Sequence, residues 1–389
     1  MSGEAALRED LALRADKMRG VLSREGADAA LVTSNVNLFY FTGAISDAFF
    51  YLPASGKPIL FARREGEPGG GQTVPIRKPE EIPALLRERG YPVPESVLLE
   101  DEDISAAEWK RLSALFREPR TGSASVRALR AVKTPYEIAL YRRSAARHAG
   151  LYEAIPSLYQ PGMTELGFSA SIEREARLRG HLGVFRSFGR RMEIFMGSLL
   201  SGDNAASVSP FDFALGGAGQ HPSVPVGMTG GPIRPGTTVM VDIGGNFEGY
   251  LTDMTRVYRL GNVPDEVYRA HQCALDIQAD LAARGRPGAV CGELYERALA
   301  MAEQAGLGGS FMGLRRQARF VGHGVGIEIN EPPVLAAGSR TVLEAGNVIA
   351  LEPKFVLPGV GAAGIENTFL VTRDGMEKLT LAREEILPL

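Results

Sequence analysis

The sequence predicts two domains, an α/β domain over residues 1–130 and an α+β domain over residues 131–389. Three observations support this division. Short apolar runs alternate with helical patterns in the first part, which is typical of a central sheet covered by helices. In the second part, helical segments are interleaved with pairs of glycine-punctuated strands. A strong helix start falls between the two parts, and 389 residues are comfortable for two domains.

The first domain opens with an amphipathic pattern that predicts a helix over about 7–25 and a buried strand at 29–33. A glycine-rich stretch near 66–72 predicts a loop, because its glycines follow no phosphate-binding spacing. The remaining expected elements are strands at 57–63 and 96–102 and helices at 82–90 and 105–116.

The second domain begins at a helix start signal formed by Thr134, Pro135 and Glu137. Thr suits the N-cap, Pro the first helical position and Glu the third, so a helix is expected through about residue 150. Further helices are expected at 164–179, 264–284 and 291–305. Strands are expected at 238–244, 250–258, 319–329, 347–356 and 364–372.

Composition excludes several classes of protein. The chain has 44% hydrophobic and 23% charged residues, as soluble globular proteins do. A net charge of −3 creates no field that would attract nucleic acid or an anionic membrane. The first residues lack the apolar segment of a secretory signal, and Cys273 and Cys291 form neither a CxxC motif nor a disulfide framework. We therefore expect a cytoplasmic protein without nucleic-acid or membrane partners.

One strand pair brings two aspartates together. If the hairpin is centred between Phe247 and Glu248, Asp242 and Asp253 face each other directly, with Cβ atoms about 5 Å apart. Two opposed carboxylates are destabilising unless a cation lies between them. The alternative is a chance pairing on a solvated face, but the apolar run before Asp242 predicts a buried strand, where an unpaired carboxylate is costly.

A second pair of acids has the same arrangement. Glu352 and Glu366 interrupt strongly apolar strand patterns, and the midpoint between them is Gly359 in a Pro-Gly loop. His323, flanked by glycines, adds an imidazole. A lone strand histidine is more often structural, but four converging acids make it a candidate ligand. Carboxylate oxygens with one imidazole suit Mn, Fe, Co or Zn, and we expect two ions about 3.5–4 Å apart.

These residues resemble those of a known family. The ordered motifs VDIGG, TDMTR, GHGVGIEINEPP, LEPKF and GIENT are similar to those of the pita-bread metallopeptidases, which use Asp, Asp, His, Glu and Glu in this chain order. Residues 26–44 resemble a creatinase-type N-terminal domain, and residues 130–145 resemble the entry to the catalytic domain. Both together favour the branch of prolidase, aminopeptidase P and creatinase over methionine aminopeptidase.

The resemblance implies a creatinase-type N-terminal domain followed by a pita-bread catalytic domain, in a homodimer. It implies metal ligation by the five residues Asp242, Asp253, His323, Glu352 and Glu366. Glu352 would also act as general base on the metal-bridging water. The leading hypothesis is an Xaa-Pro aminopeptidase or dipeptidase, whose substrate is a small peptide with proline at the second position.

Two departures from the family motifs weaken the peptidase hypothesis. Asn330 and Val226 stand where the family has histidines that contact the substrate. Asn can donate a hydrogen bond but cannot carry a proton, and Val can do neither. His221 is a candidate replacement, although a surface-loop histidine beside Pro222 is an equally good interpretation. The alternatives are a non-peptidase hydrolase or lyase of a small metabolite, and a catalytically idle binding protein.

The remaining candidates are weaker. The histidines in helical segments are interpreted as surface residues, namely His148, His181 and His271. The arginines of the 186–195 segment are interpreted as solvated or paired, with a basic substrate-facing patch as the alternative; they are Arg186, Arg190 and Arg191. Thr255 and Tyr250 flank the aspartate hairpin, and Thr255 is the better candidate for supporting a ligand.

Overall fold

The structure, a computed structural model, describes residues 3–64, 72–189, 196–211 and 213–389. It divides into two compact units, Met1–Arg130 and Ala131–Leu389, and each is described by itself. Of the predicted loop at 66–72, only Gln72 lies within the described residues, where it begins a strand.

The first unit is built on a six-stranded mixed sheet in the order β4-β3-β2-β1-β5-β6. Strand β1 pairs antiparallel to β2 and parallel to β5, as expected for an α/β domain. The strands are β1 Ala29–Val32, β2 Ala48–Pro53, β3 Ile59–Ala62, β4 Gln72–Pro75, β5 Ser96–Leu99 and β6 Glu118–Thr121. The helices are α1 Gly3–Glu25, α2 Asn35–Thr42, η1 Pro79–Glu81, α3 Ile82–Glu88, α4 Ala106–Ser113 and α5 Ser123–Ala131.

The helices of the second unit follow the predicted pattern closely. Thr134 and Glu137 form both hydrogen bonds of a capping box, so the predicted start of α6 is confirmed, and the helix continues past the expected end to Leu158. The four long helices are α6 Pro135–Leu158, α7 Glu165–Leu178, α8 Asp265–Arg284 and α9 Cys291–Gln304. In the described part of the chain, no helix is long and apolar enough to cross a membrane.

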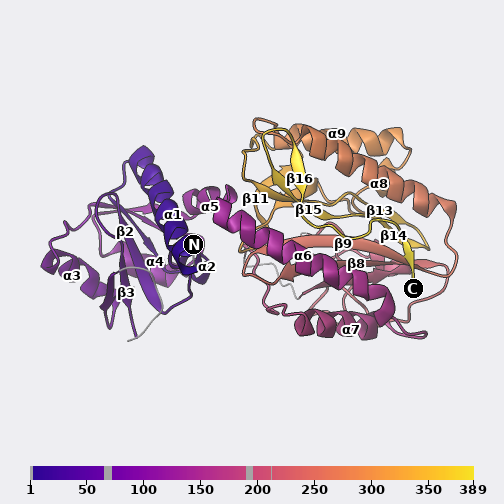
Figure 1. Cartoon of the computed structure of the whole chain (residues 1–389), viewed down its shortest axis with the longest axis horizontal. Helices are drawn as coiled ribbons and strands as arrows, with labels where there is room; N and C mark the ends of the chain where they lie inside the picture. Colours follow the sequence, from indigo (N-terminus) through magenta and orange to yellow (C-terminus); the bar gives the residue numbers. More distant parts are fainter. Residues whose placement is uncertain (1–2, 65–71, 190–195, 212) are drawn as a thin grey trace. The chain divides into compact units, whose positions relative to one another are not determined.

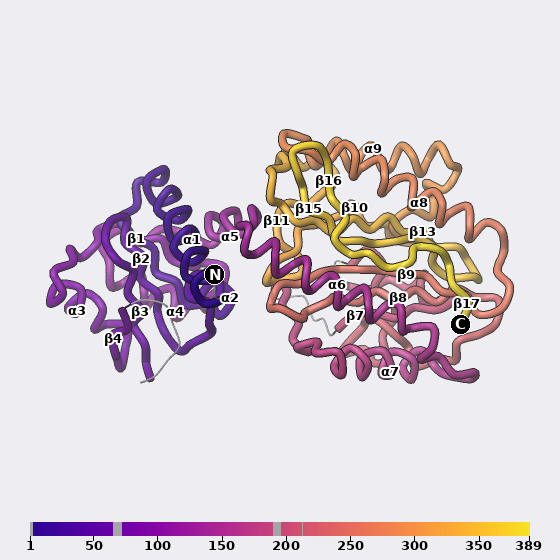
Figure 2. The backbone as a smooth tube through the Cα atoms, viewed as in Figure 1, coloured from indigo at the N-terminus to yellow at the C-terminus, as the bar shows by residue number. Residues whose placement is uncertain are grey.

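The strands of the second unit lie between two helix pairs. In Figure 1, α8 and α9 run along one side of the strands, and α6 and α7 run along the other. One sheet has the order β17-β9-β8-β7, a second has the order β11-β10-β12-β15-β16, and β13 pairs with β14. The C-terminal strand β17 returns to lie parallel to β9 (Figure 2).

These strands are formed by segments that lie far apart in the chain. They are β7 Gly197–Ser201, β8 Thr237–Asn246, β9 Leu251–Leu260, β10 Phe320–Gly324, β11 Glu331–Ala336, β12 Val348–Leu351, β13 Lys354–Leu357, β14 Gly361–Gly364, β15 Asn367–Val371, β16 Met376–Lys378 and β17 Leu387–Pro388. Two short helices, η2 Gly202–Ala206 and η3 Gly308–Ser310, complete the unit.

The register of the β8–β9 hairpin corrects one prediction. Asp242 lies opposite Thr255, and Asp253 lies opposite Gly244, so the two aspartates do not face each other directly. The turn is centred one residue later than predicted, because Gly249 adopts φ 82° and its N–H donates to Asn246 Oδ1 at 3.2 Å. Both aspartates still lie on one face of the hairpin, as diagonal neighbours.

The second hairpin has the predicted centre. Strands β13 and β14 pair around Gly359, with Lys354 opposite Gly364. Strands β12 and β15 continue the same register, with Leu351 opposite Asn367. The gap between the two ladders therefore holds Glu352 and Glu366 opposite each other.

Candidate metal centre

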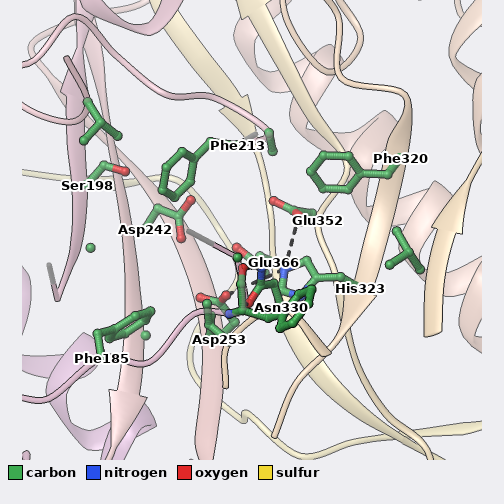
Figure 3. A pocket seen from close by; sticks show the side chains of 18 residues that line it. Phe185, Ser198, Phe213, Asp242, Asp253, Phe320, His323, Asn330, Glu352 and Glu366 are labelled. Carbon is green, nitrogen blue, oxygen red and sulfur yellow. Dashed lines mark hydrogen bonds and ion pairs between the residues drawn. The ribbon is translucent and has the colours of Figure 1, made fainter. Parts of the chain in front are cut away.

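The five predicted ligands come from separate strands and converge on one point. Figure 3 shows their side chains pointing toward one another. Asp242 lies on β8, Asp253 on β9 and His323 on β10, whereas Glu352 directly follows β12 and Glu366 directly precedes β15. Their potential ligand atoms form two groups, each with all atoms within 4.8 Å of one another. Asp253, His323 and Glu366 make the first group, and Asp242, Glu352 and Glu366 make the second.

The first group has the features of a cation site. His323 Nδ1 donates to the carbonyl oxygen of Gly324 at 3.1 Å, which leaves the lone pair on Nε2. That Nε2 lies 3.9 Å from Asp253 Oδ2. Glu366 Oε1 is buried and has no hydrogen-bond partner among the described residues. Because buried oxygens are normally paired, this group fits a metal ion.

The second group already surrounds a positive charge, which was not predicted from the sequence. Lys354 Nζ lies 2.9 Å from Asp242 Oδ2, 2.8 Å from Glu352 Oε2 and 3.1 Å from Glu366 Oε2. Burial alone lowers the pKa of Lys354, but the three carboxylates together raise it well above its ordinary value. The available signal was a lysine two residues after Glu352 in an otherwise apolar strand pattern.

Negative charge nevertheless remains in excess around the centre. Burial raises the pKa of Asp253 well above its ordinary value, and the nearby charges of Asp242 and Glu352 raise it further. Burial likewise raises the pKa of Glu366, with a further contribution from Asp253. A cation in the first group would relieve this repulsion.

Residues behind the ligands hold them in place. Thr255 Oγ1 donates to Glu366 Oε2 at 2.7 Å, which is the contact expected if Thr255 supports this proposed ligand. Thr368 Oγ1 donates to the carbonyl oxygen of Asp253 at 2.9 Å and accepts from its N–H at 2.8 Å. The buried guanidinium of Arg256 donates to the carbonyl oxygen of Glu366 at 2.9 Å. Neither Thr368 nor Arg256 was predicted from the sequence.

We expect Thr255→Val to weaken metal binding about 10- to 100-fold, because the substitution keeps the shape of the side chain but removes its hydrogen bond to Glu366. Isothermal titration with Mn²⁺ measures the affinity. Thr255→Ser, which restores the hydroxyl, should recover most of it. Equal affinities for the Val and Ser variants would show that the hydroxyl has no positioning role.

A cavity of about 420 Å³ opens over the centre. Four phenylalanines line it together with all five predicted ligands, and Val226 and Asn330 lie in its wall. The phenylalanines are Phe185, Phe188, Phe213 and Phe320. The labelled rings of three of them surround the carboxylates in Figure 3. Val226 has no polar side-chain atom, so its side chain offers the cavity no hydrogen bond.

Asn330 lies in the cavity wall, but its amide is engaged within the protein. Its Oδ1 accepts from the N–H of Phe188 at 2.6 Å, and its Nδ2 donates to the carbonyl oxygen of Phe188 at 2.8 Å. These two bonds clamp the backbone of Phe188, and they use the amide oxygen and one of the two amide N–H groups, so they do not exclude the predicted contact between Asn330 and a substrate.

His221 is exposed, and its Nδ1 lies 2.7 Å from Ser223 Oγ. Among the described residues, the cavity lining does not include His221, so the structure does not support it as a replacement for the missing histidines. The backbone of Arg186 accepts a hydrogen bond from Ile329, whereas Arg190 and Arg191 lie outside the described residues.

The interpretation of the helical histidines as surface residues is wrong. His148, His181 and His271 are all buried, because polar neighbours in sequence do not reveal which helix face packs on the strands. His148 Nδ1 lies 2.9 Å from Thr252 Oγ1, and His181 Nε2 lies 3.0 Å from the carbonyl oxygen of Gly244. Burial lowers the pKa of His148 to about 3, with a further contribution from His181.

The buried His148 predicts a loss of stability in acid. The unfolded chain binds a proton at His148 below its ordinary pKa of about 6.5, whereas the folded chain does so only near about 3, so stability falls as the pH drops between these values. From about pH 7.5 to about pH 4.5, the free energy of unfolding should fall about 3 kcal/mol more in the native protein than in His148→Gln. His221→Gln, at an exposed site, should behave as the native protein does. Equal acid losses in the native protein and in His148→Gln would contradict this account.

The fold and the cluster of four carboxylates with one imidazole fit the class of metal-dependent hydrolases, and comparison with known proteins identifies the family. Residues 139–373 match the model of metallopeptidase family M24, and residues 14–132 match the creatinase/prolidase N-terminal domain. The chain therefore belongs to metallopeptidase family M24. Members of this family use divalent metal ions.

Relatives of similar length have been recognised in several bacteria. An uncharacterized peptidase of Staphylococcus aureus is 27% identical over 374 residues, covering 92% of this chain and 96% of the relative. An uncharacterized peptidase of Bacillus subtilis is 25% identical over 383 residues, covering 96% and 99%.

Solved structures confirm the predicted pita-bread architecture. An Xaa-Pro dipeptidase from Bacillus anthracis superposes with a TM-score of 0.78 at 22% identity, over 97% of this chain and 100% of that chain. A prolidase from Pyrococcus horikoshii superposes with a TM-score of 0.76 at 21% identity, over 96% and 99%. At these identities the likeness establishes the fold.

Proposed function

We propose that this protein is a metal-dependent exopeptidase that cleaves short peptides before a proline at the second position. The convergence of Asp253, His323 and Glu366 beneath a phenylalanine-lined cavity carries the proposal. A divalent ion held there, such as Mn, Co, Zn or Fe, would polarise the scissile carbonyl and lower the pKa of a water molecule. The cavity volume falls within the range of small-ligand sites.

The chain's own residues supply the remaining chemistry. Glu352 is the proposed general base, and its two carboxylate oxygens have different neighbours. Oε2 accepts from Lys354, whereas Oε1 lies 3.5 Å from His323 Nε2 and faces the first ligand group. Proton transfer would therefore occur at Oε1, with the ammonium of Lys354 fixing the orientation of the carboxylate. The phenylalanine rings would exclude water and pack against an apolar ring such as proline.

The composition of the cavity wall favours a second candidate, a non-peptidase hydrolase or lyase of a small metabolite. The Val226 side chain provides no donor, and Asn330 uses its amide oxygen and one amide N–H to bind the backbone of Phe188. Each donor missing from an oxyanion site costs about 2–4 kcal/mol of transition-state stabilisation. A substrate that develops less oxyanion charge than a peptide would suffer less from this loss.

The decisive experiment strips the protein with a chelator and reloads it separately with Mn, Co, Zn or Fe. Hydrolysis of an Xaa-Pro dipeptide and of a longer Xaa-Pro peptide is then compared with that of matched Xaa-Ala peptides. We expect metal-restored cleavage of an Xaa-Pro bond, loss of this activity in His323→Ala, and no loss in His221→Ala. Bound metal without cleavage of either Xaa-Pro peptide would overturn the peptidase proposal and favour the second candidate. No bound metal would overturn both.

The proposal also includes a homodimer, which the family resemblance supports. It includes a cytoplasmic location, which the two free cysteines support. Sedimentation equilibrium should give twice the chain mass of 41.8 kDa. A monomer at micromolar concentration would contradict this part of the proposal and leave the chemistry untouched.

A further inference from the structure

We propose that the ammonium group of Lys354 takes the place of one divalent ion, so that the centre holds a single metal ion at Asp253, His323 and Glu366. The inference rests on the proposed metal dependence and deepens it. It departs from the two ions expected from the sequence, because one of the two ligand groups does not fit a divalent ion.

The geometry around Lys354 matches an ammonium group. Three N–H donors meet three carboxylate oxygens, one each from Asp242, Glu352 and Glu366, at 2.8–3.1 Å. A divalent ion on the same oxygens would require distances of about 2.0–2.2 Å and would occupy the position of Nζ. Lysine and metal ion therefore exclude each other at this point.

Lys354 is held too firmly to move aside at low cost. Its side chain is fully buried, so an ammonium released from the carboxylates would lack both partners and water. Its carbonyl oxygen accepts from the N–H of Met312 at 2.8 Å. Opposite it, Gly364 has φ 152°, and a Cβ there would lie 2.7 Å from Lys354 Cα, so the two strands are in close contact. Displacement of the lysine would disturb both β13 and β14.

The other ligand group remains open to a metal ion. Glu366 divides its oxygens between the two groups: Oε2 accepts from Lys354 and Thr255, whereas Oε1 has no hydrogen-bond partner within the described residues. His323 contributes its Nε2 to the same group. Four carboxylates face one ammonium, so a single divalent ion would offset most of the remaining charge, whereas a second would bring like charges into contact.

Metal stoichiometry tests the inference without an activity assay. Chelator-stripped protein is reloaded with Mn²⁺, desalted and analysed by mass spectrometry for metal content and by electron paramagnetic resonance. We expect one ion per chain with the signal of an isolated Mn²⁺, and none in His323→Ala. Lys354→Met should accept a second ion and show an exchange-coupled pair. Lys133→Met, which removes a different buried lysine paired with Glu331, should still bind one ion.

The outcomes separate the inference from the proposed function. Two ions per chain in the native protein would overturn the inference and leave the metal-dependent function intact. One ion in both the native protein and Lys354→Met would also overturn it, because the lysine would then not be what excludes the second ion. No ion in the native protein would overturn the proposed function itself. If Lys354→Met fails to fold, the resonance signal of the native protein decides between an isolated ion and a coupled pair.

Discussion

Glu366→Gln should abolish both metal binding and hydrolysis. Glu366 belongs to both ligand groups, and its Oε2 also accepts from Lys354 and Thr255. A neutral amide would weaken attraction for the metal ion and place an N–H donor against an ammonium or a metal ion. We expect activity to fall at least about 1000-fold, equivalent to about 4 kcal/mol in the activation barrier. Steady-state kinetics and metal analysis on the same preparation check both effects.

The matched control for this substitution is Glu303→Gln on α9, where the side chain is exposed. It changes the same functional group and should leave metal content and activity at native values. Native metal content in a folded Glu366→Gln variant would contradict the assignment of Glu366 to the centre. Circular dichroism on each variant excludes unfolding as the cause of a loss.

Arg256→Met should lower the free energy of unfolding by about 4 kcal/mol. The guanidinium is buried and donates to the carbonyl oxygens of Thr255, Glu366, Ala382 and Arg383 and to the side chain of Asn367. Removing the guanidinium leaves several buried acceptors without a donor, and each unsatisfied acceptor costs about 1–3 kcal/mol. Burial of the apolar Met side chain offsets part of this cost. Urea denaturation of the metal-free protein measures this loss.

Arg259→Met is the control on the same strand. Arg259 is partly exposed and donates to the carbonyl oxygen of Gly261 at 2.7 Å, so its removal should cost less than about 0.5 kcal/mol. Equal destabilisation by the two substitutions would show that the hydrogen bonds of Arg256 are not what holds β9 to the C-terminal segment.

The sequence predicted the centre of one hairpin and misplaced the other for a physical reason. Around Gly359 the apolar strands are symmetric and the loop has a Pro-Gly signature, so the pairing of Glu352 with Glu366 followed directly. In the β8–β9 hairpin, several positions could begin the turn. The hydrogen bond between Asn246 and Gly249 selects one of them, which makes Asp242 and Asp253 diagonal neighbours.

Local sequence patterns could not predict the contacts between segments that are distant in the chain. The pairing of Asn330 with Phe188 spans 142 residues, and no spacing or propensity in either segment indicates it. The burial of His148 depends on which face of α6 packs against the strands. Lys354 was visible in the sequence, but its contact with three carboxylates emerges only when β8, β13 and the segment before β15 come together.

The clamp between Asn330 and Phe188 constrains how this cavity could change by single substitutions. Asn330→His would place an imidazole where the family motif has one, but it would also lose the paired donor and acceptor that now hold the Phe188 backbone. The substitution would add a side chain that can carry a proton, but it would also weaken the attachment of the Phe188 backbone to the cavity wall. Val226 would still present no donor across the cavity. The effect of a histidine at either position therefore depends on the residues at the other positions. A histidine-lined cavity would require coordinated changes at separate positions.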